Sequence, residues 1–558
     1  MKTLEKLGSG FLLLGSMLAA TCISAAAQAP KPSDYGVVSF VNSGAAAAQE
    51  PFLRGLAALH DFEWQAAQKN FRKAESIDPN FAMAYWGEAM SYNDAVHFQQ
   101  NTEAGRAALN KLAPTEEGRL EKCGAERERE YMRAVDILYN AAGSKNERDF
   151  KYSDAMAALY HKYPNDVDAG ALYALSLLGT AHNGRDFSIY MKSLAVLEPL
   201  FCGHPYHPGV DHYLIHSVDD PIHAPLGLQA ALNYSKVALK AAHAQHMTSH
   251  IFVAMGMWDD AVKANEIATT ILNEQSAQNG KPPTVCGHYN LWLEYGYLEQ
   301  GRMHKAKEVL DACRTAALAA PVKESSSSGK SSRDTRMMPM ASPQNRQLLL
   351  SAYAQMRLRY LLDSGNWSGE VAQWRMPEGA DAGTRLSFLF AQGYGAIERH
   401  DVKGAHEALE AMAAMSGGGP SGVGTGAATA ADYAKRAAIL QQELQAMIDE
   451  AQGNRDEGIA LMRKATAAEN AMPFEYGPPF IDKPTEELLG EMLLDAQKPQ
   501  EARQAFEAAL TRTPQRTQAL LGLARAEKSA GDNQAAQDTD ATLRKIWHSA
   551  DSAVGLPL

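Results

Sequence analysis

Apolar and polar residues along this chain recur with the period of an α-helix. Alanine, leucine, glutamate, glutamine and lysine are abundant at helical spacing, and alternating runs of β-branched residues are nearly absent. The pattern therefore predicts an all-α protein. Two stretches interrupt it: residues 322–346 are polar and rich in serine and proline, and residues 416–428 are rich in glycine. These compositions are typical of flexible loops or linkers.

Small and aromatic residues repeat at one spacing near both ends of the chain. Separations of 12, 4, 3 and 5 residues connect the members of each copy, which are Gly55, Ala67, Phe71, Ala74 and Pro79 in the first and Gly490, Ala502, Phe506, Ala509 and Pro514 in the second. Small residues let two helices approach closely, an aromatic ring fills the seam between them, and proline ends a helix. The spacing resembles the tetratricopeptide (TPR) repeat, a 34-residue helix–turn–helix unit.

The resemblance implies a TPR-like α-solenoid of antiparallel helix pairs, and weaker copies extend it over most of residues 46–548. The two interruptions divide this span. We expect an N-terminal array at 46–321, a flexible linker or loop at 322–346, a helical middle section at 347–415, a Gly-rich loop at 416–428 and a C-terminal array at 429–548. The resemblance also implies a protein or peptide partner in the concave groove of the solenoid.

The first 27 residues have the three parts of a secretory signal peptide. Lys2 and Lys6 precede an apolar run from Phe11 to Ala20, and small residues follow up to Ala27. We expect cleavage after Ala27 and an exported protein, either periplasmic or secreted. No later stretch holds 18 uninterrupted apolar residues, so the sequence predicts no membrane span.

Charge and cysteine content exclude several classes of protein. The formal net charge is −12 at pH 7, whereas nucleic-acid binding depends on basic groups that neutralise phosphate. Four cysteines follow the signal segment, namely Cys123, Cys202, Cys286 and Cys313, and none stands in a CxxC motif. An exported chain permits disulfides among them. The missing CxxC argues against a thioredoxin-like centre, a zinc ribbon and c-type haem attachment.

Histidines are concentrated in one part of the predicted N-terminal array. Eight of the 17 histidines of the chain lie within residues 204–250. Spacings of three or four residues put side chains on one face of a helix, and they connect His212 with His216, and His243 with His246 and His250. Neutral imidazole is the commonest protein ligand of metal ions. The spacing therefore indicates a metal site.

The TPR register indicates that these imidazoles converge. The first helix of each TPR pair lines the groove, and Gly256, Trp258 and Ala261 fix the register of one pair without reference to any histidine. First helices of adjacent repeats lie about 8–10 Å apart, a span that two imidazoles and an ion can bridge. The resulting prediction is a zinc, copper, iron or nickel site with an inner set of His212, His216, His246 and His250, an outer pair of His243 and His288, and Asp219 as a carboxylate ligand or orienting group.

Three functions stay open at this point. The first is an exported TPR binding or scaffold protein with a metal site in its groove. The second is a metal-free TPR adaptor that binds a peptide or an envelope protein, and the third is a metal-dependent enzyme that uses Asp219, Asp220 or Tyr213 as acid or base. A zincin is excluded, because no glutamate stands between His212 and His216. Residues 200–300 also resemble secreted bacterial TPR proteins with a His-rich helix pair, which implies no particular reaction.

Overall fold

The computed structural model describes residues 34–319, 343–415, 430–474 and 476–551. These residues are almost entirely helical. Their strands amount to one two-residue antiparallel ladder, in which β1 (Asn93–Asp94) pairs with β2 (Gln99–Gln100). The predicted all-α class is therefore confirmed.

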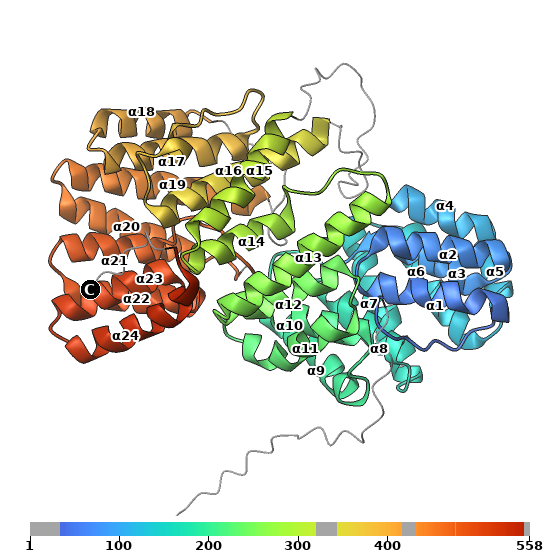
Figure 1. Cartoon of the computed structure of the whole chain (residues 1–558). Helices are drawn as coiled ribbons and strands as arrows, with labels where there is room; N and C mark the ends of the chain where they lie inside the picture. Colours follow the sequence, from blue (N-terminus) through green and yellow to red (C-terminus); the bar gives the residue numbers. More distant parts are fainter. Residues whose placement is uncertain (1–33, 320–342, 416–429, 475, 552–558) are drawn as a thin grey trace, which may run out of the picture.

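The helices stack in sequence order, and two halves are visible in Figure 1. The first half contains α1 (Ala46–His60), α2 (Trp64–Ile77), α3 (Ala82–Met90), α4 (Thr102–Leu112), α5 (Glu116–Glu121), α6 (Glu126–Asn140), α7 (Lys145–Lys162), α8 (Val167–Leu178), α9 (Phe187–Gly203), α10 (Pro208–Val218), α11 (Ala224–Val237), α12 (Ala242–Ala254) and α13 (Trp258–Gln278). The second half contains α14 (His288–Glu299), α15 (Met303–Ala319), α16 (Pro343–Ser364), η1 (Glu370–Gln373), α17 (Ala382–Glu398), α18 (Val402–Ala413), α19 (Ala430–Ala451), α20 (Arg455–Asn470), α21 (Thr485–Asp495), α22 (Pro499–Arg512), α23 (Thr517–Ser529), α24 (Asn533–Ile546) and η2 (Trp547–Ser549).

Phe71 explains why small residues recur at the repeat spacing. Its buried ring on α2 lies between Gly55 of α1 and Gly87 of α3, where added β-carbons would come within 3.0 and 2.3 Å of ring atoms. Only glycine leaves enough room for the ring at these positions. Phe506 on α22 repeats the arrangement, at 2.7 Å from the β-carbon position of Gly490. Both motif copies thus form TPR-like helix pairs that share a ring with the next pair.

The predicted interruptions fall mainly outside the described residues. This holds for residues 322–342 and for the Gly-rich segment 416–428. The predicted linker 322–346 is too long. α16 begins at Pro343, so the last four residues of the predicted linker are helical. Proline is favoured in the first turn of a helix, where its missing N–H leaves no hydrogen bond unmade.

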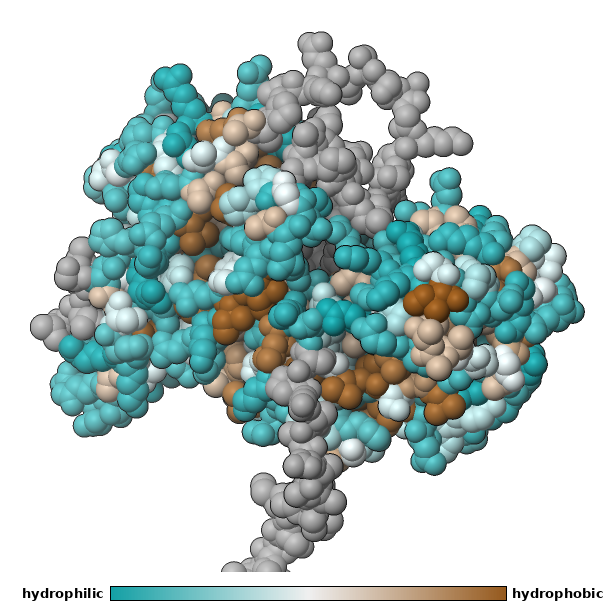
Figure 2. Space-filling view, turned by 45° about the vertical axis from the view of Figure 1, so that its right-hand side comes forward, coloured by the Kyte–Doolittle hydropathy of each residue, from teal (hydrophilic) through white to brown (hydrophobic). Residues whose placement is uncertain are grey.

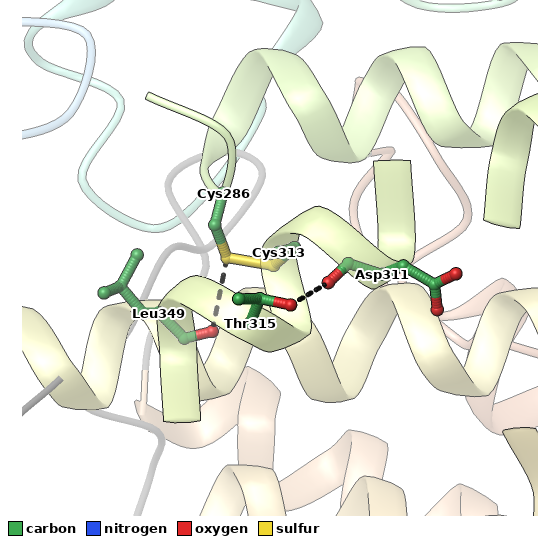
Figure 3. The surroundings of a disulfide bond; sticks show 5 residues. All are labelled: Cys286, Asp311, Cys313, Thr315 and Leu349. Atoms are coloured by element: carbon green, nitrogen blue, oxygen red, sulfur yellow. Dashed lines mark hydrogen bonds between the residues drawn. A yellow bond between two sulfur atoms is a disulfide. The ribbon is translucent and has the colours of Figure 1, made fainter. Parts of the chain in front are cut away.

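A disulfide fixes the start of α14. Cys286 and Cys313, 27 positions apart, are bonded to each other, and the Cys286 sulfur lies 3.6 Å from the carbonyl oxygen of Leu349 on α16 (Figure 3). The bond ties the segment before α14 to the middle of α15. Cys123 is buried as a free thiol.

The molecular surface is mainly hydrophilic on the face in Figure 2, and its hydrophobic residues form small patches. Apolar side chains lie chiefly between the helices, as in the cluster around Phe71. Among the described helices, none has the length and apolarity required to cross a membrane.

A buried arginine joins helices from the beginning and the end of the second half. The Arg516 guanidinium, before α23, contacts Glu299 of α14 at 2.7 Å, Asp363 of α16 at 2.6 Å and Glu487 of α21 at 2.8 Å. Glu299 also accepts hydrogen bonds from the backbone and hydroxyl of Thr517. Arg516, Glu299 and Glu487 are fully buried. Ion pairing is what makes the burial of so many charges tolerable.

We predict that Arg516→Met destabilises the junction by about 3–5 kcal/mol, because three carboxylates lose their buried counter-charge. Hydrogen exchange should accelerate in α14, α21 and α23. The control is Arg503→Met, which removes the more exposed ion pairs of Arg503 with Glu507 and Asp532 and should change stability by less than about 1 kcal/mol. Equal effects of the two substitutions would contradict a special role for Arg516.

Candidate metal centre

The structure brings all the predicted metal ligands into one region between α10, α12 and α14. α10 begins at Pro208, a residue type favoured in the first turn of a helix, and the His207 side chain accepts a hydrogen bond from the backbone of Val210 at the helix start. Each helix contributes at least one imidazole at spacings that keep its side chains on one face. The residues assembled here are His212, His216, His243, His246, His250, His288 and Asp219.

These residues form two groups of three histidines. In each group the ring nitrogens that could bind a metal lie within 4.8 Å of one another. Triad 1 is His212, His216 and His243, and triad 2 is His246, His250 and His288. Asp219 forms an overlapping group with one histidine of each triad, His216 and His250.

Burial differs within each triad. His212, His216, His246 and His250 are at most 2% exposed. His243 and His288 are half-buried. Each triad therefore has two interior imidazoles and one nearer the surface.

Two interior imidazoles are oriented through their Nδ1 atoms. His212 Nδ1 donates to the backbone carbonyl of His60 at 2.6 Å, and His246 Nδ1 donates to Asn265 Oδ1 at 2.8 Å. The Asn265 amide group donates to the carbonyl of Ala261, which fixes its oxygen toward His246. A proton on Nδ1 leaves Nε2 with a lone pair. Such outer hydrogen bonds are typical of metal-ligating histidines.

Asp219 orients the other two interior imidazoles. Its Oδ2 atom lies 2.9 Å from His250 Nδ1 and 3.4 Å from His216 Nδ1. Its Oδ1 atom accepts a hydrogen bond from the buried Arg185, which also contacts Asp220. The Arg185 guanidinium and the two imidazoles lower the pKa of Asp219 against the opposing effect of burial. The carboxylate therefore stays charged, with both oxygens engaged.

The Nε2 atoms of the four interior imidazoles are the ring nitrogens available to a metal ion. His212 Nε2 and His216 Nε2 are buried and have no hydrogen-bond partner among the described residues. His246 Nε2 lies 3.2 Å from His250 Nε2. Because Nδ1 carries the proton in both rings, two lone pairs would meet there, an arrangement that a proton or a cation between them would relieve. The donor set thus fits a metal ion.

Aromatic side chains enclose the histidines. Phe62 has a φ of 55°, and the centroid of its ring lies 4.4 Å from that of His212. Trp292 stacks on His250 at 4.6 Å, and Tyr476 from the C-terminal half contacts the same imidazole at 4.5 Å. Sequence reasoning missed these three residues as parts of the site. For Trp292 a signal existed, since it stands four residues after His288 on the same helix face.

Burial keeps three of the interior imidazoles neutral, those of His212, His246 and His250. Desolvation lowers the pKa of His212 and His246 well below the usual 6.5, and neighbouring histidines add to this effect. Desolvation also lowers the pKa of His250 to about 4, although the hydrogen bond to Asp219 acts in the opposite direction. Neutral rings are the form that binds metal ions.

A third histidine group, which the sequence did not predict, is satisfied without a metal. Asp168 accepts hydrogen bonds from His60 Nε2 at 2.9 Å and from His207 Nε2 at 3.3 Å. His60 Nδ1 accepts from the Tyr213 hydroxyl, and His207 Nδ1 accepts from the backbone of Val210. All four ring nitrogens have partners, so this cluster is a structural hydrogen-bond network.

Two residues considered as acid or base are engaged elsewhere. The Tyr213 hydroxyl donates to His60 and therefore belongs to the network around Asp168. Asp220 contacts Arg185 and the ring of His223, at 2.9 Å from His223 Nδ1. Only Asp219 remains in contact with the triads.

A large polar groove adjoins triad 1. Its volume is about 1170 Å³, and its walls come from the α1–α2 turn, the segment around β2 and the end of α13. Carboxamides such as Gln65 and Gln275 and the aromatic rings of Trp64 and Tyr92 line it. Phe62, which also lines the groove, separates it from His212.

Comparison with known proteins supports no assignment beyond the fold. No protein-family model matches the chain, and no curated protein is found as a relative. Yeast Tom70 aligns at 11% identity over 89% of this chain and 91% of its own, with a TM-score of 0.29. Human IFIT1, solved as a dimer with m7Gppp-AAAA, aligns at 12% identity over 91% of both chains, with a TM-score of 0.32. Alignments with such low TM-scores carry no argument. The evidence for a TPR-like solenoid is therefore the helix-pair packing around Phe71 and Phe506.

The metal-free protein should lose stability as the pH falls from 6.5 to 4. The folded-state pKa of His250 lies below the unfolded value. The unfolded chain therefore binds more protons than the folded protein in this window, and the stability that the folded protein has above pH 6.5 is lost. The shift corresponds to about 3 kcal/mol by pH 4.

The measurement is hydrogen exchange of α12 with a chelator present, for the wild type and for His250→Gln. Raised carboxyl pKa values, as at Glu294 and Glu443, act in the opposite direction but equally in both proteins. The wild type should therefore show the steeper loss of protection on acidification. Parallel pH profiles would refute the buried neutral state of His250.

Proposed function

We propose that this protein is an exported TPR-type binding or scaffold protein that holds a transition metal in its N-terminal groove. The observation that carries the proposal is the orientation of the interior imidazoles. Each has an acceptor for Nδ1, and the Nε2 atoms of His212 and His216 are buried without a partner in the described part of the chain. Leaving such polar atoms unsatisfied costs about 1–3 kcal/mol each, which a bound ion would offset.

The donor chemistry favours a borderline metal ion. Imidazole nitrogens suit zinc, copper, iron and nickel, whereas magnesium and calcium prefer oxygen ligands. Asp219 already accepts from Arg185 and His250 through different oxygens. We therefore assign Asp219 the orienting role, with histidines alone as protein ligands.

Export is supported by two independent features. The first 27 residues have the pattern of a secretory signal. The bond between Cys286 and Cys313 is of a kind that persists in oxidising compartments.

A metal-free adaptor is the second candidate, and the polar groove beside triad 1 favours it. Its carboxamides can pair with peptide backbone groups, and its aromatic rings offer contact surfaces. Such an adaptor would need the histidines only as part of the protein interior. Metal content therefore separates the two candidates.

We predict that tag-free protein binds zinc or copper at pH 7 with at least one equivalent per chain. Substitution of the interior histidines by alanine, as His212→Ala, His216→Ala, His246→Ala and His250→Ala together, should abolish this binding because every Nδ1-oriented ligand is lost. Elemental analysis after gel filtration provides the measurement.

The matched control is His161→Ala with His304→Ala, at two exposed positions. It should retain the full metal content. Unchanged metal content in the fourfold variant would exclude the centre, and a wild type without metal would leave the adaptor as the better description.

Metal binding should also slow hydrogen exchange around the centre, because a ligand that binds only the folded state stabilises it by about 2.7 kcal/mol at a hundredfold excess over Kd. Solenoid stability is local, so protection should rise in α10, α12 and the start of α14. Tyr476 contacts His250, and peptides from this segment should follow. α18 and α20 serve as internal controls, and uniform protection across them would argue against a local site.

A further inference from the structure

The two triads are more compact within themselves than toward each other. Within triad 1, the ring of His212 lies 4.9 Å from His216 and 5.0 Å from His243. Within triad 2, the ring of His246 lies 5.0 Å from His250 and 4.6 Å from His288. Between the triads, the ring centroids are farther apart, at 5.7 Å for His216 with His250 and 6.2 Å for His243 with His246.

One ion is therefore unable to bind all six imidazoles in this arrangement. Zinc binds histidine nitrogen at about 2.0–2.1 Å. Among the described residues, the sets of three histidine nitrogens that lie within 4.8 Å of one another are the two triads. Each triad supplies three nitrogen donors. A four-coordinate ion with three protein ligands keeps one position for water or another small ligand.

The protein supplies little negative charge for two divalent ions. All six imidazoles are neutral ligands, and the negative charge of Asp219 is balanced by the adjacent Arg185. Charges in a buried site need compensation. An anion from solution would supply negative charge that the six imidazole ligands do not.

The surroundings of the triads offer a small anion a hydrogen-bond donor and access from the protein surface. The Trp292 indole N–H is buried, and no acceptor for it is found in the described part of the chain. Its ring lies against His246, His250 and His288. The half-buried His243 and His288 lie nearest the surface, and the Tyr289 hydroxyl is 3.4 Å from His243 Nδ1.

We propose that the centre is binuclear: triad 1 holds one transition-metal ion, triad 2 holds a second, and a small anion such as hydroxide completes their coordination. The inference rests on the proposed function, since it requires that the centre binds metal at all. It adds the number of ions, their separate ligand sets and the class of the exogenous ligand.

Selective loss of one ion tests the assignment. Chelator-stripped, tag-free protein is reloaded with Cu(II), and copper is counted after gel filtration. The wild type should hold two equivalents, and His212→Ala and His288→Ala should each hold one, because each substitution leaves the other triad intact. The double variant should hold none, and the control His161→Ala with His304→Ala should hold two.

The possible results separate this inference from the proposed function. One equivalent in the wild type, lost in both single variants, would overturn the binuclear assignment and leave a mononuclear centre. No copper at all would overturn both proposals. Circular dichroism verifies folding, and His212→Gln replaces His212→Ala if the smaller side chain disturbs the buried helix.

Azide is the probe for the exogenous anion. Copper-loaded wild type should develop an azide-dependent absorption band, and its two Cu(II) ions should give less electron paramagnetic resonance intensity than two isolated ions. His288→Ala should recover the full intensity of one isolated ion. Two bound coppers with full intensity and no response to azide would contradict an anion shared by neighbouring ions.

Discussion

The burial of Arg516 against three carboxylates determines how the C-terminal helices pack on the helices that open the second half of this solenoid. A desolvated guanidinium is tolerable only with its counter-charges in place, and these come from α14, α16 and α21. The contact sets α21 and the start of α23 against α14, whose first residue is a candidate ligand. The loop before α21 then lies on the histidines: Gly477 packs on the Trp292 indole, and Tyr476 contacts His250. An ion-pair cluster far from the histidines thus helps to complete the walls of the centre.

The parts of the fold that the sequence predicted are those set by packing between helix pairs adjacent in the sequence. Repeat spacing specifies how one helix pair packs on the next, so the helix pairs around Phe71 and Phe506 could be predicted. Helical periodicity also predicted that His243, His246 and His250 share a face. The register brought in His288 because it belongs to the adjacent repeat.

Contacts between residues far apart in the sequence could not be predicted in this way. Tyr476 follows His250 by 226 positions, and no local pattern links them. Phe62 reaches His212 from the first repeat through a backbone conformation that is rare outside glycine. Trp292 has the spacing of a packing residue, and it does pack, but its neighbours are imidazoles. The orienting role of Asn265 depends on the amide direction set by Ala261, which only the folded pair reveals.

Two histidine clusters in one molecule show what distinguishes a structural network from a candidate centre. Around Asp168, each ring nitrogen of His60 and His207 has a protein partner, and the cluster needs nothing further. Each of the four interior imidazoles has an acceptor for Nδ1. Nε2 of His212 and of His216 has no partner among the described residues, and the Nε2 atoms of His246 and His250 face each other. Burial alone would favour satisfying both nitrogens, since unmade hydrogen bonds destabilise the folded state. An arrangement that orients Nδ1 of the four interior imidazoles and gives their Nε2 atoms no protein donor among the described residues is therefore a property of the site, and it is the property that a metal ion requires.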